Sequence, residues 1–144
     1  MTSVKHLPPK SERHVPLLMG LVFGRIQRSF AAEDWNGLRP SHLRVVSLVP
    51  PVGISVTDLA RRTGMTKQGC GQFVTRLVQR GLLRTEADPE DRRVRWVRRT
   101  EEGQRTLEAA TARILALEGE WADAVGHDRY RTFRAVLEEL ALEA

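Results

Sequence analysis

The sequence predicts one mainly α-helical domain that carries a small β-hairpin after a helix-turn-helix. Two helical segments joined by a four-residue turn, residues 63–66, predict the helix-turn-helix. Two short segments around a loop of turn residues, 87–93, predict the hairpin. The 144 residues are 41% hydrophobic, which suffices for one core and leaves no room for a second catalytic domain.

Two helices are expected before this motif. Residues 1–14 show no periodicity and predict a loose arm. Residues 15–32 predict the first helix, because apolar side chains recur on one stripe. Pro40 suits the first position of a second helix that runs to about Leu48, before the turn residues 50–53. The stripe of the first helix consists of Leu18, Leu21, Val22, Ile26 and Phe30.

Capping residues mark both helices of the helix-turn-helix. Ser55 and Asp58 have the spacing of a capping box, and Gly64 suits the left-handed position that ends a helix. Thr66 can cap the next helix, which Gly81 closes. The side chains expected to face inward are Val56, Leu59 and Ala60 in the first of these helices, and Cys70, Phe73, Val74, Leu77 and Val78 in the second.

The remaining elements follow in order. Residues 82–86 and 94–97 predict the two strands of the hairpin, which would make the motif a winged helix. Thr100 can cap a long fifth helix that stops at Gly126, and residues 127–142 predict a sixth. These last two helices carry more apolar surface than a winged helix of this size can cover. They therefore predict pairing with a second chain, with packing inside one chain as the alternative.

Charge is distributed unevenly along the chain. Residues 61–99 hold 11 basic and 4 acidic residues, whereas residues 100–144 hold 5 basic and 10 acidic ones. Between Asp58 and Glu86 there is no acidic residue. A patch of one sign attracts a polyanion, although a solvated basic face is the alternative. The acidic C-terminal third argues against simple coating of an anionic membrane.

Several classes of function are excluded by the residue content. One cysteine forms no intrachain disulfide, and the four histidines show no metal-ligand spacing. No phosphate-binding loop or nucleophile elbow occurs, so we expect no enzyme, no metal and no cofactor. The apolar residues 15–24 are followed by Arg25 and Arg28, which favours a helix over a signal peptide. No apolar run is long enough to cross a bilayer, so we expect a cytoplasmic, nucleoid-associated protein without a membrane partner.

Residues 55–103 resemble the MarR family of winged helix-turn-helix regulators. The specific part is the wing segment Asp88-Pro89-Glu90-Asp91-Arg92-Arg93, followed by Thr100-Glu101-Glu102-Gly103. The segments Asp58-Leu59-Ala60 and Gly64-Met65-Thr66-Lys67 and residues 76–82 also match, so that about a third of the chain is covered. The resemblance implies a single domain over residues 1–144, with dimerisation helices at 15–32 and 100–144 and a winged helix at 40–99. It implies a homodimer that places two winged helices on one face of duplex DNA.

The expected DNA contacts lie on the second helix of the motif and on the wing. Gln68, Gln72 and Arg76 share one helix face, where glutamine can bond to adenine, and Arg76 could instead hold phosphate or pair internally. Thr66 and Lys67 lie at the helix start, which favours phosphate. The wing would contribute Arg92, Arg93 and Arg95, since arginine can enter a narrow minor groove. By resemblance, Asp91 would orient Arg93.

Gly69 and Gly71 depart from the family, which usually carries small polar residues at these places. They allow either close approach of backbone to phosphate or a loose helix that orders on DNA. Cys70 fits a core position better than a redox site, although a helix start favours the thiolate. The resemblance also suggests a small aromatic ligand between the dimer helices and the winged helix. Its candidate contacts are Phe23, Arg28, Trp35 and His42.

The leading functional hypothesis is a transcriptional repressor on a pseudo-palindromic operator, either constitutive or released by a small ligand. Two alternatives remain: a winged helix that docks another protein, and a non-specific architectural DNA binder. The acid-free run favours DNA over a protein partner, and binding to unrelated duplexes at physiological salt would identify the architectural class.

Overall fold

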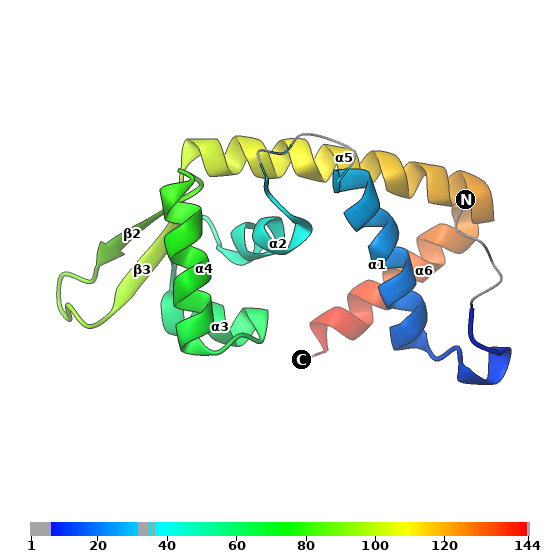
Figure 1. The fold of residues 1–144 in the computed structure, drawn as a ribbon, viewed down its shortest axis with the longest axis horizontal. Coiled ribbons are helices and arrows are strands. Elements are labelled where there is room, and N and C mark those ends of the chain that lie inside the picture. The colour runs from blue at the N-terminus through cyan, green and yellow to red at the C-terminus, as the bar shows by residue number, and fades with distance from the viewer. Residues whose placement is uncertain (1–6, 32–34, 36, 144) are drawn as a thin grey trace. The chain divides into compact units, whose positions relative to one another are not determined.

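The computed structural model describes residues 7–31, 35 and 37–143 (Figure 1). The chain divides into two compact units, and the boundary along the chain falls between Pro40 and Ser41, at the start of α2. The first unit contains a short 3-10 helix, η2 (Lys10–Glu12), and the first predicted helix, α1 (Val15–Ala31). At the end of α1 the rings of Phe30 and Trp35 stack with their centroids 5.0 Å apart. The apolar side chains of α1 are largely uncovered within this unit, including Leu18, Leu21 and Val22 of the predicted stripe.

The second unit contains the winged helix and the two C-terminal helices. Its elements are α2 (Pro40–Leu48), β1 (Ile54–Ser55), α3 (Val56–Thr63), α4 (Lys67–Gln79), β2 (Leu83–Ala87), β3 (Arg95–Arg99), α5 (Glu101–Val125) and α6 (His127–Leu142). All six predicted helices are present, and the predicted fold class is confirmed. In the described part of the chain, no helix is long and apolar enough to cross a membrane.

The sheet differs from the predicted hairpin in two ways. Both wing strands lie one or two residues further along the chain than expected, and a third strand, β1, pairs with β3. The strand order is β1-β3-β2, all antiparallel, with Val97 opposite both Ile54 and Thr85. The strand β1 has two residues and overlaps the cap of α3, so that no alternating run could reveal it.

The caps of the helix-turn-helix are those expected. The Ser55 hydroxyl accepts a bond from the Asp58 amide at 3.1 Å, and the Thr66 hydroxyl accepts one from the Gly69 amide at 3.0 Å. Gly64 ends α3 with φ 72°, in the left-handed region where glycine has no steric cost. The turn therefore holds α4 at a fixed angle to α3.

The inward side of α4 joins a continuous core. Cys70, Val74 and Leu77 are buried, together with Leu59 and Ala60 of α3. The expectation for Val78 is wrong, because this side chain is 37% exposed and turns outward. Eight residues advance an α-helix by about 80° beyond two full turns, so that the stripe that begins at Cys70 has drifted away from the core at Val78.

A close backbone contact joins α5 to the end of the helix-turn-helix. A Cβ atom on Gly103 would lie 2.0 Å from the Leu82 carbonyl oxygen, so that only glycine fits here. The Thr100 amide donates to the same carbonyl at 3.2 Å, and the Thr100 hydroxyl caps α5 by accepting from the Gly103 amide at 2.9 Å. The motif Thr-Glu-x-Gly is therefore a structural junction.

Two arginines of the basic region also have structural roles. Arg99 donates to the carbonyl oxygens of Val46 (3.0 Å) and Ser47 (2.9 Å) at the end of α2, and to Gln104 Oε1 (3.0 Å) in α5. Arg98 pairs with Glu86 on β2 and donates to the Val52 carbonyl at 2.6 Å. These guanidinium groups connect the sheet to its neighbours and do not project from it.

The last two helices form a hairpin at Gly126, which adopts φ 98° (Figure 1). The Tyr130 hydroxyl donates to Glu118 Oε1 at 2.6 Å and so joins α6 to α5. Burial, together with this bond to the carboxylate, raises the pKa of Tyr130 to about 12. The phenol therefore stays protonated at neutral pH and keeps its donor role.

We expect Gly103→Ala to destabilise the fold, because the new methyl group would overlap a backbone carbonyl that cannot move away. The expected loss is about 2 kcal/mol or more of unfolding free energy. Chemical denaturation monitored by circular dichroism measures it. Gly119→Ala, also in α5, is the matched control, because nothing lies within 4 Å of its added Cβ. Equal stability of the two variants would contradict the close contact.

Candidate nucleic-acid interface

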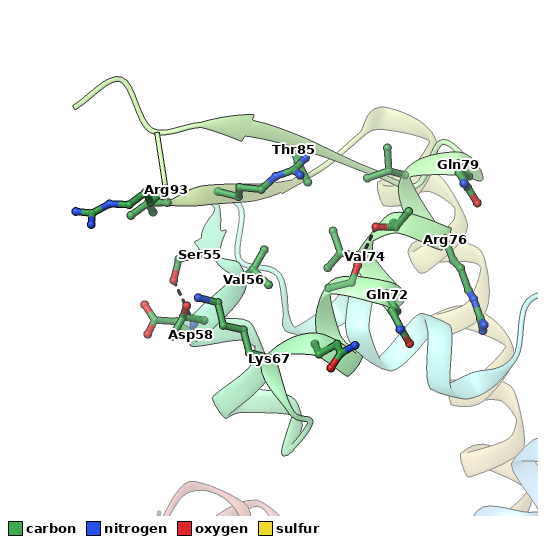
Figure 2. Close-up of a pocket in the computed structure, with 17 residues that line it drawn as sticks. Ser55, Val56, Asp58, Lys67, Gln72, Val74, Arg76, Gln79, Thr85 and Arg93 are labelled. Atoms are coloured by element: carbon green, nitrogen blue, oxygen red, sulfur yellow. Dashed lines mark hydrogen bonds between the residues drawn. The ribbon is translucent and has the colours of Figure 1, made fainter. Parts of the chain in front are cut away.

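An open groove runs between the outer face of α4, the start of α3 and the wing (Figure 2). Its volume of about 1610 Å³ exceeds the roughly 300–1,000 Å³ that is typical of small-molecule pockets. A macromolecule is therefore the better match in size. The groove is lined by Ser55, Val56, Thr57, Asp58, Lys67, Gln68, Gly71, Gln72, Val74, Thr75, Arg76, Val78, Gln79, Thr85, Arg93, Val94 and Arg95.

The outer face of α4 presents the amide and guanidinium groups that the helical spacing predicts. Gln68, Gln72 and Arg76 all line the groove and are exposed to solvent. Figure 2 shows Gln72 and Arg76 projecting from the same side of the helix. Consecutive members of this row are four residues apart, so that the three side chains follow one edge of α4.

The two glycines of α4 have different surroundings. A Cβ on Gly71 would meet nothing within 4 Å, and this residue lines the groove. The backbone of Gly71 is therefore accessible to a molecule that binds in the groove. A Cβ on Gly69 would lie 3.0 Å from the Thr66 hydroxyl oxygen that caps the helix. At Gly69 the cap itself gives a reason for glycine, which sequence reasoning did not consider.

Asp88 organises the turn of the wing, a role that sequence reasoning missed. Its Oδ1 accepts from the amides of Glu90 (2.8 Å) and Asp91 (3.2 Å), and its Oδ2 accepts from the Trp96 indole at 2.7 Å. The Trp96 bond above all, together with the two amide bonds, holds the pKa of Asp88 below its ordinary value. An aspartate before proline is a common turn signal, but its partner Trp96 lies eight residues further on.

The expected contact between Asp91 and Arg93 is present. The guanidinium donates through Nε (3.1 Å) and Nη2 (3.3 Å) to the two oxygens of the carboxylate. This side-chain bond, assisted by the Arg93 amide, lowers the pKa of Asp91. The Arg93 side chain remains 91% exposed, so that the pair orients the cation without hiding it.

Arg95 is held in the groove by the opposite strand. Its Nη2 donates to the Thr85 hydroxyl at 2.8 Å, and both residues line the groove. Thr85 gave no signal in the sequence, because the pairing of β2 with β3 depends on strand register. The structure brings together seven of the ten predicted DNA contacts on this groove: Lys67, Gln68, Gly71, Gln72, Arg76, Arg93 and Arg95. It leaves Thr66, Gly69 and Arg92 outside the lining.

The groove is strongly but not purely cationic. Lys67, Arg76, Arg93 and Arg95 line it, against the single carboxylate of Asp58. Asp58 pairs with Arg61 at 3.0 Å, which offsets its charge. The lining therefore carries a net positive charge, which would attract a polyanion.

The candidate ligand contacts are divided between the two units. Phe23, Arg28 and Trp35 belong to the first unit and His42 to the second. Within the second unit the His42 ring lies against Phe73 of α4, with 5.5 Å between the ring centroids. The ligand cleft stays a prediction.

Cys70 lies in the core, as the spacing of apolar residues in α4 predicts. Its side chain is fully buried, and burial raises the pKa of the thiol, with a bond to Thr63 opposing the shift. Since the thiolate is the reactive form, this environment disfavours oxidation.

Known proteins resemble this chain in both sequence and structure. A sequence model described as the MarR family matches residues 36–94. An uncharacterized protein of Mycobacterium tuberculosis is 34% identical over 90 residues, which are 62% of this chain and 63% of that protein. Transcriptional regulator HosA of Escherichia coli is 33% identical over 72 residues, which are 50% of this chain and 53% of HosA. The chain thus matches less than two thirds of the length of these relatives.

Two solved structures extend the similarity beyond the winged helix. A MarR-family transcriptional regulator from Rhodococcus sp. RHA1 is 25% identical, with a TM-score of 0.75 over 90% of this chain and 91% of that one. CouR from Rhodococcus jostii RHA1, solved with bound p-coumaroyl-CoA, is 26% identical, with a TM-score of 0.69 over 90% of each chain. With the wing motif and the order of its helices and strands, these matches show that the chain is similar to the MarR family over its winged helix and shares the fold of winged-helix regulators of that family.

Proposed function

We propose that this chain is a sequence-specific regulator of transcription that binds duplex DNA as a homodimer and represses from a pseudo-palindromic operator. The observation that carries the proposal is the groove itself. The amide-rich face of α4 and the arginines of the wing open onto one cationic surface. Such a protein works in the cytoplasm at the nucleoid, and it needs no metal or cofactor for this activity.

The two sides of the groove match the two grooves of DNA. An α-helix fits the major groove, where Gln68 and Gln72 can each bond to both exposed groups of an adenine. The wing reaches the adjacent minor groove, where Arg93 meets the enhanced negative potential of a narrow segment. Between them Lys67 and Arg95 face the phosphate backbone, which contributes most of the affinity.

Dimerisation would place a second copy of this surface about one helical turn, roughly 34 Å, along the duplex. The terminal helices supply the apolar surface for it. Large hydrophobic side chains remain exposed on α1, α5 and α6, among them Met19, Leu115 and Phe133. A two-fold symmetric pair of winged helices reads a two-fold symmetric operator, so the homodimer accounts for the pseudo-palindrome.

Release by a small aromatic ligand is a further part of the proposal. CouR, a relative with this fold, binds p-coumaroyl-CoA. Here the His42 ring on α2 contacts Phe73, on the partly buried side of the recognition helix α4. A ligand that displaces α2 would therefore act on α4 directly, and it shifts the population towards dimers whose recognition helices no longer match the half-sites.

Selection of bound fragments from random duplex DNA tests the proposal as a whole. We expect a pseudo-palindromic motif, and a gel shift that weakens steeply as salt rises. Equal recovery of unrelated duplexes would instead identify an architectural binder. Failure to bind any duplex at low salt would favour a protein-docking module and overturn the proposal.

We expect Arg93→Ala to weaken binding to many sequences alike and to lower the slope of log affinity against log salt by about one, because one phosphate or minor-groove contact is lost. Fluorescence anisotropy across a salt series measures both quantities. Arg105→Ala is the control, since this arginine is equally cationic but does not line the groove. An unchanged slope for Arg93→Ala would remove the wing from the interface.

We expect Gln72→Ala to relax the base preference at one position in each half-site, at a cost of about 1–3 kcal/mol for the preferred base. Repeating the selection with this variant measures the change. Lys67→Ala is the informative contrast, because loss of a phosphate contact weakens binding without altering the motif. A motif identical to that of the unmodified protein would show that Gln72 reads no base.

We expect Asp88→Asn to loosen the wing turn, because the amide keeps the shape but loses the charge that the two backbone amides and the Trp96 indole bind. Faster hydrogen exchange at Glu90 and Asp91, with weaker DNA binding, is the expected result. The helical amides of α4 serve as the internal control. Unchanged exchange at the turn would mean that the hydrogen bonds of Asp88 do not hold the wing.

A further inference from the structure

The groove face of α4 has an apolar side next to its row of amide and guanidinium groups. Gly71, Thr75 and Val78 follow each other at spacings of four and three, so that they share one side of the helix, and all three line the groove. We call these three residues the apolar strip. Gly71 and Thr75 directly precede Gln72 and Arg76, and therefore lie about 100° around the helix from that polar row.

The hydroxyl group of Thr75 is already engaged within the helix. It donates to the carbonyl oxygen of Gly71 at 2.9 Å. A threonine side chain has one hydrogen-bond donor, so this bond uses it. Thr75 is exposed and lines the groove. To a molecule in the groove it therefore offers a methyl group and no free donor.

Gly71 leaves a hollow next to Thr75 on the apolar strip. A Cβ atom on Gly71 would meet nothing within 4 Å, so that the space of a side chain is open here. Glycine inside a helix is less stable than alanine, and among the described residues no contact with this Cβ requires glycine. A ligand group that fills the hollow would give a reason for the glycine.

The groove continues this apolar character on both of its sides. Val78 is 37% exposed at the end of the strip, and Val56 and Val94 also line the groove. A phosphate backbone is bound by cations and hydrogen-bond donors, and it has no use for such side chains. Among the base edges of the major groove, the 5-methyl group of thymine is the one methyl group, and apolar side chains recognise it.

We infer that Gly71 and Thr75 recognise thymine through its 5-methyl group. The methyl group enters the hollow at Gly71 and packs against the methyl group of Thr75, while Val78 adds apolar surface one turn further along α4. The inference rests on the proposed function and deepens it. It adds a contact that depends on shape and apolar surface to the hydrogen bonds expected of Gln68 and Gln72.

Replacement of thymine by deoxyuridine tests this contact, because it removes the 5-methyl group and keeps every hydrogen-bonding group of the base. The probe is the duplex recovered by the selection experiment, with the thymines of one half-site replaced one at a time. At one position we expect the affinity to fall about fourfold, which is the effect of one buried methyl group. Fluorescence anisotropy measures it, and replacement outside the half-sites is the control. A selected motif without thymine, or equal affinity after every replacement, would overturn the inference.

Substitution of Thr75 identifies the protein side of the contact. Thr75→Ser keeps the hydroxyl group and removes the methyl group, so it should bind the thymine and deoxyuridine duplexes about equally. Thr75→Val keeps a methyl group and should still distinguish them. Thr132→Ser in α6 is the matched control, because Thr132 is also exposed and donates to the carbonyl four residues earlier, at 3.1 Å, but does not line the groove. A change in duplex shape would affect all variants alike, so a thymine preference that persists in Thr75→Ser would overturn the inference.

Substitution of Gly71 tests the hollow. The methyl group of Gly71→Ala has room in the free protein and favours the helix, so that thermal stability should not fall. We expect this variant to lose more affinity for the thymine duplex than for the deoxyuridine duplex, because its methyl group occupies the hollow. Equal losses for the two duplexes would indicate that the backbone of Gly71 approaches a phosphate instead, and would overturn the inference.

The outcomes also distinguish this inference from the proposed function. A chain that selects a pseudo-palindromic motif and binds it in a salt-dependent manner, but does not distinguish thymine from deoxyuridine, would leave the proposed function standing and overturn the thymine contact. A chain that binds no duplex at low salt would overturn both.

Discussion

One backbone contact joins the winged helix, which bears the groove, to the long helix α5. Gly103 in the first turn of α5 lies against the Leu82 carbonyl, at a separation that no side chain could share. Thr100 adds two hydrogen bonds at the same place, from its amide to Leu82 and from its hydroxyl to Gly81. The end of α4, the start of β2 and the start of α5 therefore meet in one rigid junction. The long helix α5 cannot tilt without moving the winged helix that it supports.

Six basic residues of the winged helix fall into two groups with different roles. Arg98 and Arg99 point inwards and bind backbone carbonyls of the α2 end and the loop that follows it. Lys67, Arg76, Arg93 and Arg95 line the groove and are exposed to solvent. In the first group the guanidinium groups add hydrogen bonds to carbonyl oxygens and so link β3 to the end of α2 and to the loop after it. The second group lies on the open surface of the groove, where its charge would act directly on a DNA backbone.

The caps explain why so much of the fold could be predicted from the sequence. Ser55, Gly64, Thr66, Thr100 and Gly126 act within one or two turns of chain, so that local pattern is sufficient to place the helix ends. The strands depend on pairing between distant residues, which is why the sequence does not predict β1 and places the bounds of the wing strands one or two residues too early. Val78 shows a third limit of sequence-based prediction. The apolar spacing that begins at Cys70 fits the buried side of α4 at first, but within two turns it has rotated away from the core.

In the candidate site, too, local features could be predicted from the sequence, whereas contacts between distant residues could not. The row on α4 could be predicted, because residues four apart share a helix face whatever surrounds them. Asp91 and Arg93 could be predicted from the family resemblance, and their bidentate contact is present. The roles of Asp88 and Thr85 could not, since both depend on partners across the hairpin, Trp96 and Arg95. The residues that hold a site in place are thus less visible in a sequence than the residues that face the ligand.

The helix α5 physically connects the winged helix to α6. It has 25 residues, which corresponds to a rod of about 37 Å, and its two ends carry different parts of the proposed function. Its first turn is fixed to the winged helix through Gly103, and its C-terminal part is joined to α6 through the bend at Gly126 and the bond between Tyr130 and Glu118. In the proposed dimer α5 would therefore connect the region where the two chains pair to the recognition helix α4. In that dimer the separation of the two recognition helices would depend on helix packing far from the DNA, so that a change in this packing would alter DNA binding without a contact to any base.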